Sequence, residues 1–159
     1  MKKLTIALLL FTLSAFTSWA GDFQEGVNAY DSGDYTTALK EFAALAEQGD
    51  ADAQFNLALM YTNGHGVPQD YKQAVKWYTK AAEQGDAEAQ YNLGTMYAIG
   101  QGVPQDNVYA HMWFNLAAVD GDEKASGKRD IIAKRMTTEA LSKAQSLARE
   151  CLKKNYKGC

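Results

Sequence analysis

An internal repeat of 36 residues constrains the fold of this 159-residue chain more than any other feature of its sequence. The run Ala-Glu-Gln-Gly-Asp at 46–50 recurs at 82–86, and the run Gly-x-Gly-Val-Pro-Gln-Asp at 64–70 recurs at 100–106. A period of this length is typical of solenoid proteins, in which each unit buries its apolar face against its neighbours. The repeat therefore predicts a stack of similar units rather than a single closed core.

Each unit is predicted to contain two helices, because apolar residues recur at helical spacing on both sides of the glycine-rich loop. In one unit the two stripes are Ala53, Leu57, Met60 and Tyr61, and Ala74, Trp77, Tyr78, Ala81 and Ala82. Small alanines let helices approach closely, and we expect the large rings of Trp77, Trp113, Tyr61 and Tyr97 to fill the core.

Glycine and aspartate mark the predicted helix ends. Gly49, Gly85 and Gly121 suit left-handed caps of the second helices, and the aspartates that follow them suit N-caps of the next helices. Asp70 and Asp106, just after the prolines, are predicted to cap the second helices of the two central units.

These motifs resemble the SEL-one-like repeat, a relative of the tetratricopeptide repeat. The resemblance rests on Ala-Gln-x-Asn-Leu-(Ala/Gly)-x-Met-Tyr, on the Gly-x-Gly-Val-Pro-Gln-Asp loop, and on Ala-x-x-Trp followed by Ala-Ala-x-x-Gly-Asp. It implies an all-α fold, an α/α right-handed superhelix (solenoid) of helix-turn-helix repeats. It also implies an adaptor that holds other proteins together, without indicating any single partner.

We divide the chain on this basis into five segments. They are a leader at 1–20, a first repeat at 21–49, SEL-one-like repeats at 50–85 and 86–121, and a degenerate capping repeat with its tail at 122–159. The loop of the first repeat is four residues shorter, which makes this unit closer to the tetratricopeptide form. In the last segment we expect a charged helix to about Arg135 and a long helix from Thr137.

The leader has the composition of a secretory signal peptide. Lys2 and Lys3 precede an apolar run at 4–16, and small residues at Ser18 and Ala20 suit signal peptidase, with a cut after Ala20. The run is too short for a transmembrane helix, which needs about 20 apolar residues. We therefore expect a protein of the periplasm or one that is secreted, without stable membrane insertion after cleavage.

The two cysteines, Cys151 and Cys159, are predicted to form a structural disulfide in an oxidising compartment. A straight helix would place their Cα atoms about 12 Å apart, which is too far for a disulfide. The chain must therefore fold back, and Gly158 supplies the conformational freedom. The pair lacks the C-x-x-C spacing of a redox site.

Charge and motifs argue against most other functions. The net charge of −3 gives no basic field for nucleic acid. The sequence contains no P-loop, H-E-x-x-H or G-x-S-x-G motif. We interpret His65 as a tolerant loop position and His111 as a residue of the surface or groove. We therefore expect no catalytic residue, metal site or cofactor.

A binding surface is the remaining route to function. In the tetratricopeptide architecture, the first helix of each unit lines the concave face, so the same register predicts the residues of a groove. These partner-binding candidates are Phe23, Val27, Tyr30, Asp52, Phe55, Leu59, Asn63, Glu88, Tyr91 and Thr95. Rigid rings are favoured anchors at interfaces, although aromatics at helical spacing also serve as core residues.

The sequence therefore predicts a non-enzymatic adaptor, expected to be a monomer, that binds a partner polypeptide in the groove. One alternative is a hydrolase acting on cell-wall or β-lactam material, since cysteine-rich relatives of the family have been linked with β-lactam binding. The Ser-x-x-Lys motif of penicillin-recognising enzymes is absent from the sequence. Another alternative is a structural component that stacks on itself.

Overall fold

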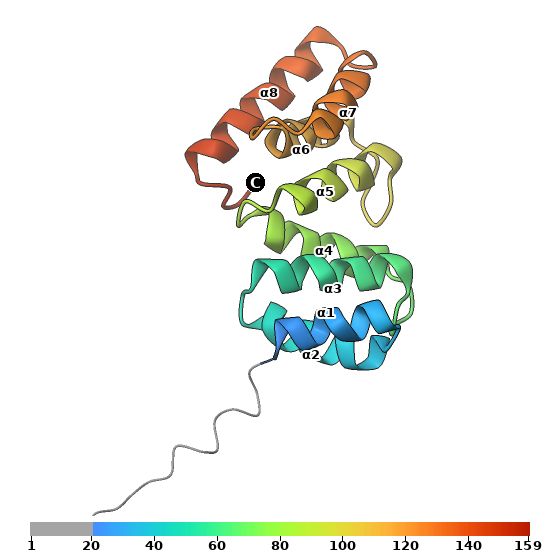
Figure 1. Ribbon diagram of the computed structural model, residues 1–159. Helices are drawn as coiled ribbons and strands as arrows, with labels where there is room; N and C mark the ends of the chain where they lie inside the picture. The colour runs from blue at the N-terminus through green and yellow to red at the C-terminus, as the bar shows by residue number, and fades with distance from the viewer. Residues whose placement is uncertain (1–20) are drawn as a thin grey trace, which may run out of the picture.

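The computed structural model describes residues 21–159, which form eight α-helices and no strand. The helices follow one another in pairs that stack into an elongated solenoid (Figure 1), so the all-α prediction is confirmed. The predicted signal peptide at 1–20 lies outside the described residues. In chain order the helices are α1 (Phe23–Ser32), α2 (Tyr35–Glu47), α3 (Ala51–Asn63), α4 (Tyr71–Ala82), α5 (Ala87–Ile99), α6 (Asn107–Ala117), α7 (Glu123–Ala133) and α8 (Thr138–Lys153).

Side-chain caps explain why the helices begin where they do. The carboxylates of Asp50, Asp86 and Asp122 each accept a hydrogen bond from the backbone amide three residues later, at 2.8, 2.7 and 2.9 Å. Asp70 and Asp106 cap α4 and α6 in the same way. The capping predictions are therefore confirmed, because these carboxylates satisfy amides that have no partner within the helix.

The core lies between paired helices and between successive pairs. α3 packs on α4 and α5 on α6, while α2 contacts α3 and α4 contacts α5 along the stack. Trp77 and Trp113 are buried, as predicted, at 8% and 2% exposure. Tyr61 and Tyr97 are only half-buried and pack at the margin of the core, so the prediction that they lie inside it holds in part.

The glycine-rich loops join each unit to the preceding one. Gly66 has φ of 72°, and a Cβ atom there would lie 2.7 Å from the carbonyl oxygen of Tyr35 at the start of α2. Gly102 approaches Tyr71 at the start of α4 in the same manner. Both the left-handed backbone and the close approach require glycine, which explains why the loop motif recurs.

Two buried glutamines hold neighbouring units together. Nε2 of Gln54 on α3 donates to the carbonyl oxygen of Ala46 at 3.1 Å, and Nε2 of Gln90 on α5 donates to that of Ala82 at 3.2 Å. Each acceptor is a carbonyl in the last turn of the preceding second helix, and it also accepts the backbone amide of Gly49 or Gly85 in the turn that follows. These side chains therefore fix how one pair sits on the next.

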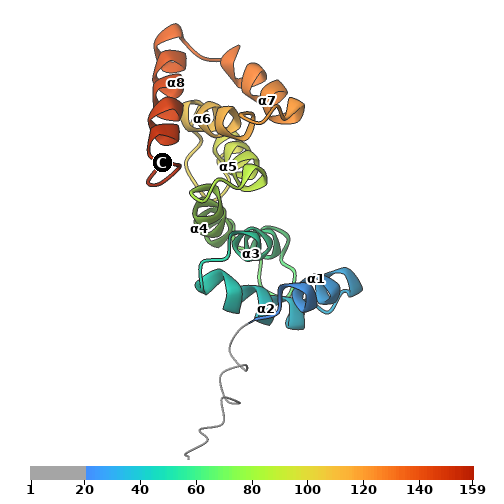
Figure 2. The same ribbon diagram turned by 60° about the vertical axis from the view of Figure 1, so that its left-hand side comes forward.

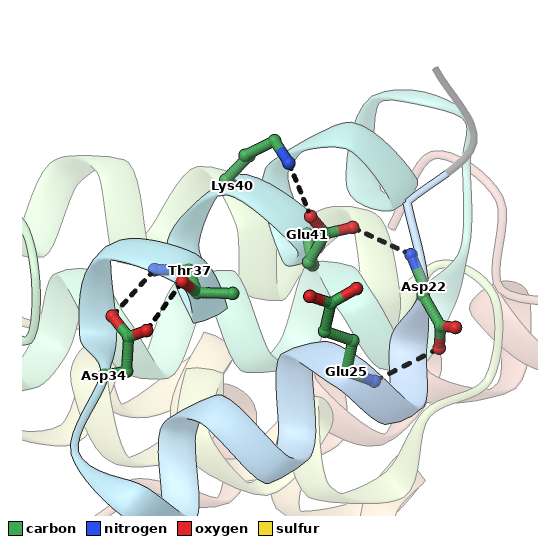
Figure 3. A network of polar contacts seen from close by, with 6 residues as sticks. All are labelled: Asp22, Glu25, Asp34, Thr37, Lys40 and Glu41. Atoms are coloured by element: carbon green, nitrogen blue, oxygen red, sulfur yellow. Dashed lines mark hydrogen bonds and ion pairs between the residues drawn. The ribbon is translucent and has the colours of Figure 1, made fainter. Parts of the chain in front are cut away.

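The amino-terminal end of the described chain is closed by a polar network (Figure 3). The buried carboxylate of Glu41 on α2 accepts hydrogen bonds from the backbone amide of Asp22 at 2.9 Å and from Nζ of Lys40 at 3.0 Å. The hydrogen bond from the Asp22 backbone amide lowers the pKa of the Glu41 carboxyl group, and the hydrogen bond from Lys40 lowers it further. The ionised carboxylate therefore anchors the start of α1 to α2.

The last two helices depart from the pairing seen in the other units. α8 packs on α6, and α6 also carries α7. Figure 2 shows α7 and α8 joined at one end and splayed apart along their lengths. The final helix therefore covers the second helix of the preceding unit, and it leaves one side of α7 without a neighbouring helix.

The carboxyl-terminal tail folds back beneath α8, as the cysteine spacing predicts. Cys151 and Cys159 lie at disulfide distance, with Cα atoms 5.4 Å apart. The reversal uses left-handed backbone at Asn155, Tyr156 and Gly158. Of these three residues, the sequence predicts a role in the reversal only for Gly158. The ring of Tyr156 packs against the core and lies beside Gly85, so this contact offsets the cost of its backbone conformation.

Candidate functional site

One aromatic side chain occupies the same place on the first helix of three successive units. Phe23, Phe55 and Tyr91 are half-buried, and each packs on a fully buried ring from the second helix of its own unit. The ring centroids lie 5.7, 5.7 and 5.5 Å apart, which is the range of favourable aromatic pairs. The buried partners are Phe42, Tyr78 and Phe114.

These pairs serve the core and the surface at once. Each first-helix ring packs on its buried partner and is itself only half-buried, so part of it remains accessible. Burial raises the pKa of Tyr78 to about 12, so its hydroxyl group is neutral at physiological pH. The geometry therefore provides fixed apolar contact points at the spacing of the repeat.

The other groove candidates are also accessible from solvent. The structure places Asp52, Asn63 and Glu88 among the exposed residues, and Val27, Leu59 and Thr95 among the half-buried ones. All of them lie on α1, α3 or α5, the first helices of their units. We call the surface formed by α1, α3, α5 and α7 the first-helix face.

The structure brings two of these candidates together in a hollow. Glu88 and Tyr91 on α5 line a depression of about 260 Å³ whose far side is formed by Asp122 and Lys124 at the start of α7. Thr95, one helical turn further along α5, lines a second depression between the same two helices. Both of these depressions therefore lie at the junction of α5 and α7.

Tyr30 has a structural role that its sequence position does not reveal. Its hydroxyl group and Nδ1 of His65 share a hydrogen bond at 3.0 Å, and the His65 ring stacks on Tyr35 with centroids 4.2 Å apart. The His65 side chain is therefore half-buried and hydrogen-bonded to the first unit, whereas the matching position of the next unit holds Gln101. The imidazole joins the loop of the second unit to both helices of the first.

His111 is also placed differently from the prediction. The side chain is 3% exposed on α6, so it belongs neither to the surface nor to a groove. Its Nδ1 atom has no hydrogen-bond partner within residues 21–159, and burial, together with the nearby Arg129 guanidinium, lowers the pKa of the imidazole. The matching residue of the preceding unit is Val75, which indicates that the position accepts an apolar side chain.

The described residues contain few features that would support catalysis. Across residues 21–159, no group of three or more histidine, cysteine, aspartate or glutamate side chains is placed to hold a metal ion. None of the eight helices is both long and apolar enough to cross a bilayer. What the arrangement offers is a surface for contact, with rings, carboxylates and amides presented on rigid helices.

Sequence reasoning missed the part of the first-helix face that α7 contributes. Lys124, Lys128, Ile131 and Arg135 line the two depressions opposite α5. The repeat register decays after Asp122, so it gave no means of assigning these residues to a face. The one available signal was Ile131, a large apolar residue within a mostly charged helix. Exposed apolar residues indicate a binding surface when several of them lie together, as Ile131 and Ile99 do here.

The comparisons with known proteins agree with this architecture. The Sel1 repeat family model matches residues 51–86 and 87–122. A search of curated proteins found no match.

Two solved structures with similar folds are more than 30% identical in sequence. One is c5321, a protective antigen present in uropathogenic Escherichia coli strains that displays an SLR fold: the TM-score is 0.78 and the identity 33%, over 82% of this chain and 29% of that one. The other is a Sel1 repeat protein from Oxalobacter formigenes, with a TM-score of 0.68 and 31% identity, over 81% of this chain and 55% of that one. The chain thus spans less than a third and about half of their respective lengths.

Proposed function

Because the chain belongs to the Sel1 repeat family, whose members are generally protein-interaction scaffolds, we propose that it binds a partner polypeptide on its first-helix face. The bound segment lies along α3 and α5 as an extended chain or a helix. Aromatic rings anchor its apolar side chains, and exposed polar side chains fix its register.

The observation that carries this proposal is the set of three aromatic pairs. Phe23, Phe55 and Tyr91 repeat on one face, and each is held in place by a buried ring behind it. Binding loses less conformational entropy when the contact residues are already ordered. Tyrosine and other aromatic residues also dominate the binding energy of many protein interfaces.

Polar groups beside the rings supply hydrogen bonds of both kinds. Asp52 and Glu88 offer carboxylate acceptors, and the exposed Asn63 at the end of α3 offers both a donor and an acceptor. These side chains would make binding selective. A partner that lacks a complementary donor or acceptor would leave the carboxylates and the amide desolvated without a hydrogen bond. This division into apolar anchors and polar selectors is the one that we propose for the face.

The proposed setting of this interaction is the periplasm or the outside of the cell. Two observations support it, the signal-like composition of residues 1–20 and the pair Cys151 and Cys159 at disulfide distance. A disulfide is typical of oxidising compartments, so the partner would be an exported or surface polypeptide.

Site-specific photo-crosslinking in intact cells tests the proposal. A photo-reactive amino acid replaces Tyr91 on the first-helix face, or Lys72 on α4 as the matched control, with the natural leader retained. Mass spectrometry then identifies the adducts. We expect one polypeptide to be captured from Tyr91 and not from Lys72, and equal capture at both positions would contradict the proposal.

A further inference from the structure

A second depression on the first-helix face has a distinct chemistry. It holds about 180 Å³ between the second half of α5 and the second half of α7, with the ring of Phe114 on α6 among its lining groups. Ile99 and Ile131 face it from the two helices. At 57% and 48% exposure they are two of the four most exposed large apolar side chains in residues 21–159. We call this hollow the isoleucine depression.

The charged groups around the isoleucine depression are all cationic. Lys128 and Arg135 line it from the α7 side, and no aspartate or glutamate does so. Both side chains are exposed, and neither makes an ion pair within the described part of the chain. Arg129 between them is instead engaged with Asp130 and Asn115. The depression therefore presents an apolar centre with two unneutralised cations.

The charge of the whole molecule reinforces this local pattern. Residues 21–122 contain 4 basic and 15 acidic side chains, a net charge of −11, whereas residues 123–159 contain 10 basic and 4 acidic side chains, a net charge of +6. The acidic region forms most of the solenoid, from α1 to α6, and the basic region forms its carboxyl-terminal end with α7 and α8 (Figure 1). Such a field repels an acidic partner from most of the protein and directs it to the carboxyl-terminal end.

We propose that the isoleucine depression binds an acidic polypeptide segment by one large apolar side chain, with flanking carboxylates paired to Lys128 and Arg135. This inference rests on the proposed function, because it specifies the partner chemistry at one end of the same face. The apolar side chain fills the space over Ile99, Ile131 and Phe114, and the charges determine which segments are attracted and in which register.

The dimensions favour a side chain over a free small molecule. Ligand pockets for small molecules usually enclose about 300–1,000 Å³, which is larger than this hollow. A polypeptide can use a smaller depression, since a segment that also contacts Thr95 and the neighbouring Tyr91 gains its affinity from several contacts. The occupant is therefore a segment that continues along α5.

Selection from a random twelve-residue peptide library displayed on phage tests the inference. The immobilised protein is either the wild type or the double variant Lys128→Glu with Arg135→Glu. A second double variant, Lys143→Glu with Arg149→Glu, carries the same change of charge on exposed positions of α8 and serves as the control. Circular dichroism verifies that each variant retains its helices.

The wild type is expected to enrich peptides that contain a large aliphatic or aromatic residue flanked by aspartate or glutamate. A synthetic peptide of that consensus should bind the double variant at Lys128 and Arg135 at least tenfold more weakly, and the α8 control less than twofold more weakly, by fluorescence anisotropy. Ile131→Ser should weaken binding by a similar factor, and raising the salt concentration should weaken it further.

Several results would overturn the inference. They are the absence of enriched peptides, a consensus without acidic residues, or equal losses in the two double variants. Concentration-dependent self-association that Lys128→Glu with Arg135→Glu abolishes would show that a second copy is the occupant. Sedimentation with phosphatidylglycerol vesicles that depends on Ile131 would show a membrane instead. If the selected peptides compete with crosslinking at Tyr91 but bind the wild type and the double variant at Lys128 and Arg135 equally well, the proposed function stands and this inference fails.

Discussion

At the residue scale, His111 shows how one position can depart from its repeat. The imidazole is buried, and its lowered pKa arises first from desolvation and then from the positive charge of Arg129, with Asp130 acting weakly in the opposite sense. In the unfolded chain the imidazole of His111 becomes protonated as the pH falls below about 6.5, whereas in the folded chain it becomes protonated only at a lower pH. The free energy of unfolding therefore falls as the pH drops through that value toward the pKa of the folded state.

The substitution His111→Val tests this effect because it removes the imidazole and introduces valine, which the preceding unit has at the matching position, Val75. Urea denaturation at several pH values should show that the stability of the wild type relative to the variant declines between pH 7 and pH 5. The difference is expected to be constant above about pH 8, where the imidazole is neutral in both the folded and the unfolded chain. A difference that does not change across this range would mean that the imidazole is protonated equally in both states.

Trp113 and Trp77 are the residues whose loss should most damage the core. Their side chains are buried at 2% and 8% exposure, and truncation of either to alanine leaves a cavity between helices. Each substitution should lower the free energy of unfolding by about 3–5 kcal/mol in chemical denaturation. Ile99→Ala is the control, since a side chain that is 57% exposed should contribute about 0.5 kcal/mol or less. Wild-type stability in Trp113→Ala would place the core elsewhere.

At the element scale, the helices of the two central units follow from local signals. Aspartate caps, glycine ends and apolar stripes are short-range features, and they predict the bounds of α3 to α6 closely. The packing of α8 on α6 depends on contacts between distant segments, which no local pattern encodes. The same reason accounts for the burial of His111 and for the unpredicted contribution of α7 to the first-helix face.

The pairing of Cys151 with Cys159 is also tested at this scale. The cross-link closes a short loop at the end of α8 and holds Tyr156 against the core, so its loss should free the tail. Cys151→Ala with Cys159→Ala should lower the free energy of unfolding by about 2–3 kcal/mol, by the loop-closure argument. Mass spectrometry of the protein recovered from its natural compartment should show no free thiol. Two free thiols there would contradict the prediction.

At the scale of the whole molecule, the repeat explains both the solenoid and the face that it displays. Three units each contain one aromatic pair, and the two central units also share the interlocking glutamine and the glycine-rich loop. The 36-residue period predicts the alignment of Phe55 with Tyr91, and the tetratricopeptide resemblance extends it to Phe23 in the first unit, whose loop is shorter. The sequence cannot predict which polypeptide the proposed face would bind, because exposed side chains are free of the packing constraints that create the pattern.

A crosslinking map of the partner that Tyr91 captures tests the central claim most directly. Photo-reactive residues are placed one at a time at the exposed positions Asp52, Asn63 and Glu88 on the first-helix face, and at Lys72, Lys76 and Gln145 on second helices. We predict that adducts with the purified partner form at the first three positions and fall at least tenfold at the others. Adducts of equal yield on both sets, or on the second helices alone, would contradict the account.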